Sequence, residues 1–151
     1  MNRRQLRDYT FKLLFHVTFY QNGELDDQLE NYLDECMFPE EGQLLLTEPE
    51  KEELKVRFRD INGKLPEINA KIEEAAEGWK PERMNRVDLT ILRLACYEIG
   101  FDEEVPEKVA INEAVELAKK YGGDESPRFV TGVLSKLVRK PEASDPDHQA
   151  E

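Results

Sequence analysis

One stretch of the sequence, residues 82–99, constrains the fold more than any other. An α-helix built from it would have almost no polar side, because its apolar residues are Val87, Leu89, Ile91, Leu92, Leu94, Ala95, Cys96, Tyr97 and Ile99. A helix that is apolar nearly all round has to be covered by other elements, so it lies at the centre of a core. The rest of the chain must therefore supply several elements that surround it.

The surrounding elements are predicted to be helices as well. Apolar residues recur every three or four positions in six further segments, and glycine and proline fall mainly between them. These segments are residues 3–20, 25–37, 49–62, 66–77, 105–121 and 126–139. No stretch alternates apolar and polar residues long enough to indicate a strand, so the fold class is all-α with about seven helices. We expect a helical domain over residues 1–140 and a disordered polar tail over 141–151.

Length and composition indicate a single folded domain without a membrane span. With 151 residues and 17.6 kDa, the chain fits one domain with a sizeable core. No apolar run approaches the roughly 18–20 residues that span a bilayer, and no signal peptide is apparent. We therefore expect a cytoplasmic protein without membrane contact. The two cysteines, Cys36 and Cys96, form no metal-binding or redox pair and are predicted to be small core residues.

The net charge of −12 argues, taken alone, against nucleic-acid binding. The charge is unevenly distributed, however. Residues 1–21 carry four basic residues against one acidic residue, whereas residues 22–77 carry six against seventeen and residues 78–151 eleven against fifteen. Because charges are screened over about 8 Å at physiological salt, the basic end can still bind nucleic acid locally.

Signals of catalysis are nearly absent from the sequence. It contains no HExxH, CxxC, GxGxxG, GxxxxGK or GxSxG motif. His16 lies within the first predicted helix and is expected at its surface, while His148 lies in the tail. We therefore expect neither an enzyme nor a bound metal or cofactor.

The first predicted helix carries a stripe of arginine and phenylalanine beside its apolar face. On a helical wheel, Arg4, Arg7, Phe11 and Phe15 fall together, next to Arg3 at the helix start. Guanidinium groups bind phosphate and aromatic rings stack on unpaired bases, so the stripe predicts a surface for single-stranded RNA. The alternative is that both phenylalanines pack into the core and the arginines are simply solvated.

A second candidate surface lies at the start of the last predicted helix, in the segment DESPRFVTGVL. Here Ser126 is predicted to cap the helix, and Arg128 and Phe129 follow in the first turn. Unpaired N–H groups at a helix start favour an anion, so this turn could hold a phosphate and stack a base. The alternative is a serine that only caps, a solvated arginine and a phenylalanine of the core.

Three blocks of the sequence resemble the bacterial transcription antitermination factor NusB family. They are NRRQLRDYTFKLLF at the start, NRVDLTILRLACYEI over residues 85–99, and VPEKVAINEAVELAKKYGGDESPRFVTGVLSKL over 105–137. The resemblance implies a fold of two packed helical sub-bundles. It also implies binding of the boxA element of ribosomal RNA operon transcripts, jointly with the ribosomal small-subunit protein NusE. In this family, that complex helps RNA polymerase resist termination, which supports efficient transcription of ribosomal RNA genes.

The resemblance also assigns roles to individual residues. The positions that match RNA-binding positions of the family are Arg3, Arg4, Arg7, Phe15, Ser126, Arg128 and Phe129. Glu125 matches an acidic position that influences binding, and Glu82 and Asp88 match positions on the side that meets NusE. The sequence departs from the family pattern at Gln5-Leu6, which replaces a frequent Arg-Ala pair, and its body is more acidic than that of many members. In addition, Arg128 replaces a usual lysine.

Together, the residues and the resemblance predict a non-enzymatic RNA-binding factor. If the starts of the first and last helices are adjacent, Arg7 and Phe129 line one RNA groove. One alternative is an acidic helical adaptor that binds only protein. Another is an RNA-modifying enzyme, because some ribosomal RNA cytosine methyltransferases carry a domain of this fold. Monomer and homodimer both remain open.

Overall fold

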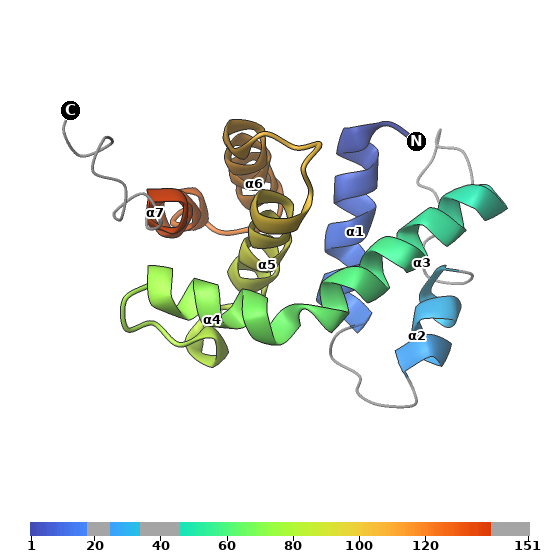
Figure 1. The fold of residues 1–151 in the computed structure, drawn as a ribbon, viewed down its shortest axis with the longest axis horizontal. Helices are drawn as coiled ribbons and strands as arrows, with labels where there is room; N and C mark the ends of the chain where they lie inside the picture. The colour runs from blue at the N-terminus through green and yellow to red at the C-terminus, as the bar shows by residue number, and fades with distance from the viewer. Residues whose placement is uncertain (18–24, 34–45, 140–151) are drawn as a thin grey trace. The chain divides into compact units, whose positions relative to one another are not determined.

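The computed structural model describes residues 1–17, 25–33 and 46–139, and their regular secondary structure consists of helices joined by turns, with no strand (Figure 1). Its elements are α1 (Arg3–Val17), α2 (Leu25–Asn31), α3 (Glu48–Gly63), α4 (Leu65–Ala75), the 3-10 helix η3 (Pro81–Arg83), α5 (Arg86–Phe101), α6 (Glu107–Tyr121) and α7 (Ser126–Arg139). The all-α prediction is confirmed. The chain divides into two compact units, residues 1–63 and 64–151, as expected for two sub-bundles.

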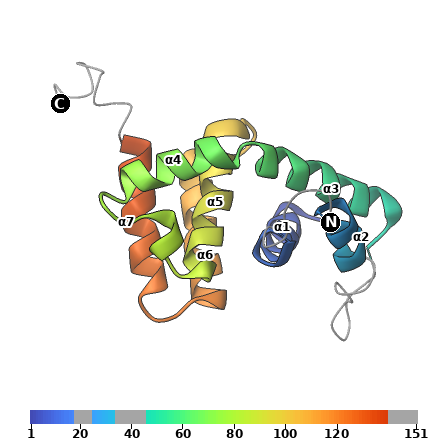
Figure 2. The same cartoon turned by 90° about the horizontal axis from the view of Figure 1, so that it is seen from below.

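Helix α5 is the central element of the second unit. It packs against α4, α6 and α7, and Figure 2 shows α4 running across α5 and α7. The side chains of Ile91, Leu92 and Leu94 on α5 are fully or almost fully buried, as are Ile72 of α4 and Leu134 of α7. The prediction of a central helix is therefore confirmed, because every neighbouring helix of this unit covers part of α5.

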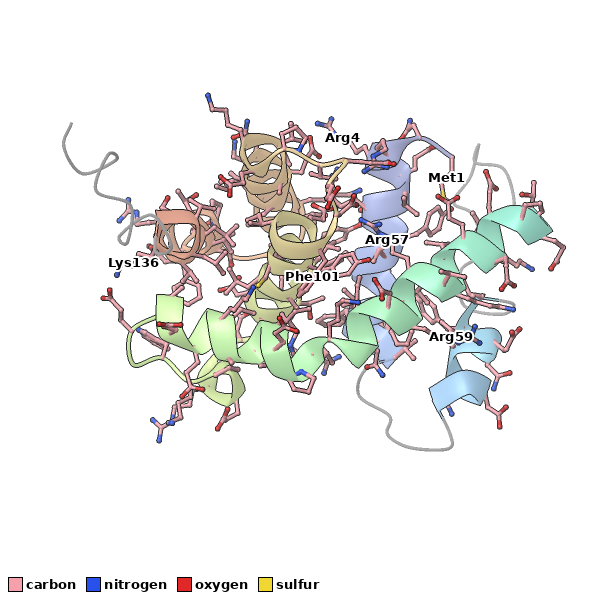
Figure 3. The ribbon with its side chains drawn as sticks, in the orientation of Figure 1. Met1, Arg4, Arg57, Arg59, Phe101 and Lys136 are labelled. Atoms are coloured by element: carbon pink, nitrogen blue, oxygen red, sulfur yellow. The ribbon has the colours of Figure 1, made fainter. Side chains whose placement is uncertain are left out.

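The ends of α5 differ from the prediction of residues 82–99. Pro81–Arg83 forms a separate 3-10 turn, and Asn85 caps α5 by accepting a hydrogen bond from the Asp88 N–H at 2.9 Å. At the other end, Gly100 does not stop the helix. Phe101 continues it, with its ring 5.3 Å from both Lys64 Nζ and Lys71 Nζ (Figure 3). These cation–π contacts favour one more residue of helix.

The first unit is built from α1, α2 and α3. Helix α1 packs against both others, and its predicted apolar face is buried: Leu6, Thr10, Leu13, Leu14 and Val17. Helix α3 buries Leu54, Phe58 and Ile61. The predicted ends of the first two helices, residues 18–20 and 34–37, lie outside the described residues, as do the loop at 39–45 and the tail at 141–151.

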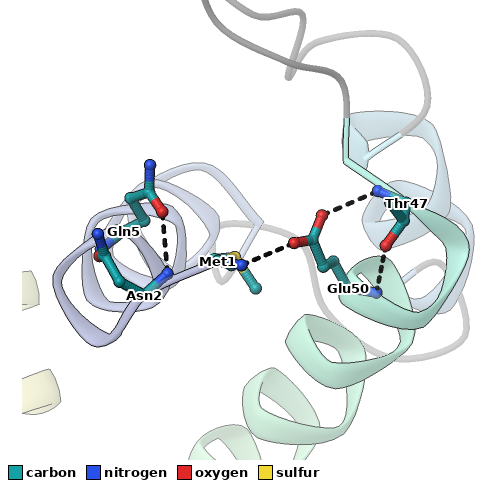
Figure 4. A network of polar contacts seen from close by, with 5 residues as sticks. All are labelled: Met1, Asn2, Gln5, Thr47 and Glu50. Atoms are coloured by element: carbon teal, nitrogen blue, oxygen red, sulfur yellow. Dashed lines mark hydrogen bonds and ion pairs between the residues drawn. The ribbon is translucent and has the colours of Figure 1, made fainter.

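The starts of α1 and α3 are joined by a polar network (Figure 4). In α1, Asn2 Oδ1 accepts from the Gln5 N–H at 2.8 Å, and Gln5 Oε1 accepts from the Asn2 N–H at 2.9 Å, which forms a capping box. Thr47 and Glu50 form a second box at the start of α3. The Met1 ammonium lies 2.8 Å from Glu50 Oε2, and this hydrogen-bonded ion pair raises the pKa of the amine and lowers that of Glu50.

The buried Cys96 thiol gives a test of the packing around α5. Its side chain is 1% exposed, and burial raises the pKa of the thiol to about 11, from an ordinary value of 9.0. In a Cys36→Ser variant, we expect a thiol reagent at pH 8 to label Cys96 only through unfolding. The thiol of the unfolded chain ionises near pH 9, whereas the buried thiol keeps its proton up to about pH 11. The contribution of Cys96 to the free energy of unfolding is therefore fully present below pH 9 and is lost progressively as the pH rises towards 11. Fast labelling without denaturant would contradict the packing described.

Candidate nucleic-acid interface

The capping box at the start of α1 places Arg3 and Arg4 in the first turn of the helix. Because Asn2 and Gln5 satisfy each other's backbone N–H groups, the helix begins at Arg3. Arg3 and Arg4 are exposed in that turn, whereas Arg7 in the next turn is only 6% exposed. The helix dipole disfavours cations at this end, and no acidic residue occupies the first turn to offset them. Positive charge is thus concentrated on Arg3 and Arg4.

The two phenylalanines of the predicted stripe have different environments. Phe11 is 3% exposed, so for this residue the core alternative is confirmed. Phe15 is half-buried, with its ring centroid 6.1 Å from that of Phe11 and 5.1 Å from that of His16. The exposed His16 stacks in turn on Tyr32, at 5.1 Å. The surface expectation for His16 is confirmed, and Phe15 lies at the border between the core and an aromatic row.

The start of α7 is built differently from the prediction, which made Ser126 the capping residue. The Phe129 N–H donates to the Glu125 carbonyl at 3.0 Å, so Glu125 precedes the first turn and Ser126 lies inside it. The Ser126 hydroxyl accepts from the Gly123 N–H at 3.1 Å, and the Ser126 N–H donates to the Gly123 carbonyl at 3.1 Å. The buried serine therefore closes the turn before α7.

This arrangement reduces the anion site that was expected at the α7 start. The amides of Ser126 and Phe129 are engaged, and Pro127 has no N–H. The groups of this turn that a ligand can contact are chiefly the exposed guanidinium of Arg128 and the half-buried ring of Phe129.

Phe129 is not alone on this surface. Its ring centroid lies 5.8 Å from that of Trp79, with the two planes at 68°. Trp79 is 54% exposed and follows α4. The Lys136 ammonium of α7 donates to Glu77 Oε1 at 2.8 Å, close to the same segment (Figure 3). Trp79 matches a position of the family pattern ahead of the core helix, but the sequence assigned it no role, because its place outside the helical periodicity carried no signal of exposure.

The three acidic residues that the resemblance singles out, Glu82 and Asp88 for the partner side and Glu125 for its influence on binding, differ in exposure. Glu82 in η3 and Glu125 before α7 are exposed. Asp88 in the first turn of α5 is 8% exposed, and its Oδ1 has no hydrogen-bond partner within the described part of the chain. Glu82 thus presents its charge to the surroundings, whereas Asp88 lies mostly inside.

The predicted RNA-binding residues fall in both units. Arg3, Arg4, Arg7 and Phe15 belong to the first unit, and the group of Ser126, Arg128 and Phe129 belongs to the second. A single groove that joins them stays a prediction. Among the residues that the structure describes, no cluster of three or more His, Cys, Asp or Glu could hold a metal ion. None of the described helices is long and apolar enough to cross a membrane.

Comparison with known proteins gives consistent matches over nearly the whole chain. The model of the NusB family matches residues 4–139. A transcription antitermination protein NusB from Lachnoclostridium phytofermentans is 49% identical over 140 residues, covering 91% of this chain and 99% of that protein. The solved T. maritima NusB is 34% identical with a TM-score of 0.76, over 93% of this chain and 92% of that one. A crystal structure of antitermination factors NusB and NusE in complex with dsRNA matches the fold with a TM-score of 0.68 at 24% identity, over 91% and 96% of the two chains.

The turn before α7 predicts opposite behaviour for two neighbouring glycines. A Cβ at Gly122 would lie 2.6 Å from the Ser126 Cβ and 2.9 Å from the Ala118 carbonyl oxygen, whereas a Cβ at Gly123 meets nothing within 4 Å. We expect Gly122→Ala to lower the free energy of unfolding by about 1–3 kcal/mol, because the start of α7 must shift. The matched control Gly123→Ala should change it by less than about 0.5 kcal/mol. Urea unfolding of both variants measures this, and equal effects would refute the close approach.

Proposed function

The chain belongs to the NusB family, and from this premise we propose that it binds single-stranded boxA RNA of ribosomal RNA operon transcripts jointly with NusE. It is a transcription antitermination factor, and the proposed complex would act on RNA polymerase. The observation that carries the proposed RNA contact is the presence of exposed guanidinium groups at two helix starts, two on α1 and one on α7. Arg3 and Arg4 begin α1, and Arg128 lies beside the aromatic Phe129 on α7.

Each of these groups has a definite task in the proposed contact. Arg3 and Arg4 would bind phosphates, since guanidinium matches phosphate with two parallel hydrogen bonds. Arg7, being mostly buried, would contribute less charge to the bound strand. The rings of Phe15 and Phe129 would stack on bases, as aromatic side chains do on unpaired nucleotides. Ser126 would contribute indirectly, because its hydroxyl accepts a hydrogen bond that closes the turn before Arg128 and Phe129.

The strongly acidic chain supports a contribution from a partner protein. A net charge of −12 repels RNA beyond the local basic sites, and a basic partner on the acidic side would offset this repulsion. The NusB of one solved crystal structure, whose fold this chain shares, is in complex with NusE and dsRNA, so a protein of this fold can hold NusE and an RNA together. Glu82 and Asp88 are the proposed contacts to NusE. We further propose that the protein acts without catalysis and in the cytoplasm.

RNA binding can be tested by fluorescence anisotropy of a labelled boxA oligonucleotide, titrated with and without NusE at several salt concentrations. For single strands, each neutralised phosphate contributes a slope of about −0.7 to the logarithm of the binding constant against the logarithm of salt. We expect Arg3→Ala/Arg4→Ala to weaken binding and to make this slope shallower by up to about 1.4. The control Arg59→Ala removes an exposed arginine of the same unit and should leave the slope unchanged. Absence of RNA binding even with NusE would favour the protein-only adaptor.

The proposed NusE contact is tested separately, without RNA. Glu82→Gln removes an exposed charge from η3, and Glu103→Gln removes one from the segment between α5 and α6. A charge at the edge of an interface mainly speeds association. We therefore expect Glu82→Gln to lower the association rate constant for NusE several-fold at low salt, and Glu103→Gln to leave it nearly unchanged. Equal rates for wild type and Glu82→Gln, measured by biolayer interferometry, would exclude Glu82 from the contact.

A further inference from the structure

We propose that Trp79 is a base-stacking residue of the RNA-binding surface, and that it forms with Phe129 a two-ring platform for adjacent nucleotides. This inference rests on the proposed function and extends it to a residue outside every predicted site. The platform lies wholly within the second unit, on the segment after α4 and the first turn of α7.

The Trp79 side chain is exposed to a degree that is unusual for tryptophan. It is 54% exposed, although a tryptophan side chain gains more than most others from burial. The other large apolar side chains that the structure shows as exposed are aliphatic: Met1, Val56 and Val109. Only Trp79 among these four therefore offers a flat aromatic surface to a ligand.

Trp79 is held in its exposed position by the turn before it and by contacts with α7. The preceding Glu77 and Gly78 have positive φ values of 52° and 101°, and a glutamate seldom adopts this conformation. Two contacts with α7 fix the segment in place: the Glu77–Lys136 ion pair at 2.8 Å and the Trp79–Phe129 ring contact. An exposed ion pair contributes little stability, so the ring contact is the stronger of the two restraints on this segment. The strained turn holds the indole against Phe129.

The Trp79 and Phe129 rings are arranged edge to face. With the planes at 68°, the edge of one ring meets the face of the other, and each ring keeps a face that its neighbour does not cover. Bases stack on such faces without regard to sequence. The exposed Arg128 precedes Phe129 in the chain and supplies a cation for the accompanying phosphate. The rings and the guanidinium group together match the base and the phosphate of a nucleotide.

The fluorescence of Trp79 can be used as the first readout, because the chain contains a single tryptophan. We expect boxA RNA, added to the complex with NusE, to quench Trp79 emission and to protect it from acrylamide. The same titration with Trp79→Phe measures the part of the emission change that comes from NusE. Contact with a base produces this protection, whereas a purely structural role of Trp79 does not.

Affinity supplies the second measurement. We expect Trp79→Ala to weaken binding of labelled boxA RNA by about fivefold or more, with the salt dependence unchanged, because stacking neutralises no phosphate. Trp79→Phe should retain part of the affinity. The matched control Val109→Ala truncates an exposed apolar side chain of the same unit and should bind as wild type does. Circular dichroism and thermal melting establish that each variant is folded.

The outcomes separate this inference from the proposed function. If wild type binds RNA, while Trp79→Ala binds equally well and Trp79 emission stays constant, the platform is refuted and RNA recognition stands. If NusE alone protects Trp79 and RNA adds nothing, the residue belongs to a protein interface and the platform is equally refuted. If wild type binds no RNA in the presence of NusE, both proposals fall together.

Discussion

Burial of α5 is the constraint on which the second unit depends. Ten of its sixteen residues are buried, so α4, α6 and α7 have to pack around it. Their arrangement brings the segment after α4 beside α7, where Glu77 meets Lys136 and Trp79 meets Phe129. A surface assembled from residues some fifty positions apart thus follows from the need to cover one apolar helix.

The sequence predicted what depends on periodicity and missed what depends on local hydrogen bonding. The apolar faces of α1 and α5 were read correctly, because helical spacing alone identifies a buried face. The role of Ser126 was misread, since its hydroxyl bonds Gly123 and not the first turn of its own helix. The burial of Arg7 and the exposure of Trp79 were likewise invisible, because both are set by neighbours distant in sequence.

The structure also explains a departure from the family pattern that the sequence raised. Gln5 stands in the arginine-rich segment, where a further cation was expected from the resemblance. Its side-chain oxygen accepts a hydrogen bond from the Asn2 N–H, whereas an arginine side chain has no acceptor atom. The residue therefore defines where α1 begins, and it does so next to the arginines whose positions matter most for the proposed contact.

At Glu77 the side chain and the backbone favour different residue types: the ion pair with Lys136 requires a carboxylate, whereas the positive φ disfavours glutamate. Glycine or asparagine would adopt the positive φ of this position more easily, but neither could reach Lys136. The identities of positions 77 and 136 should therefore be coupled during evolution. If Lys136 were replaced by an uncharged residue, the glutamate would lose its ion-pair partner, and glycine or asparagine would suit the backbone of this turn better.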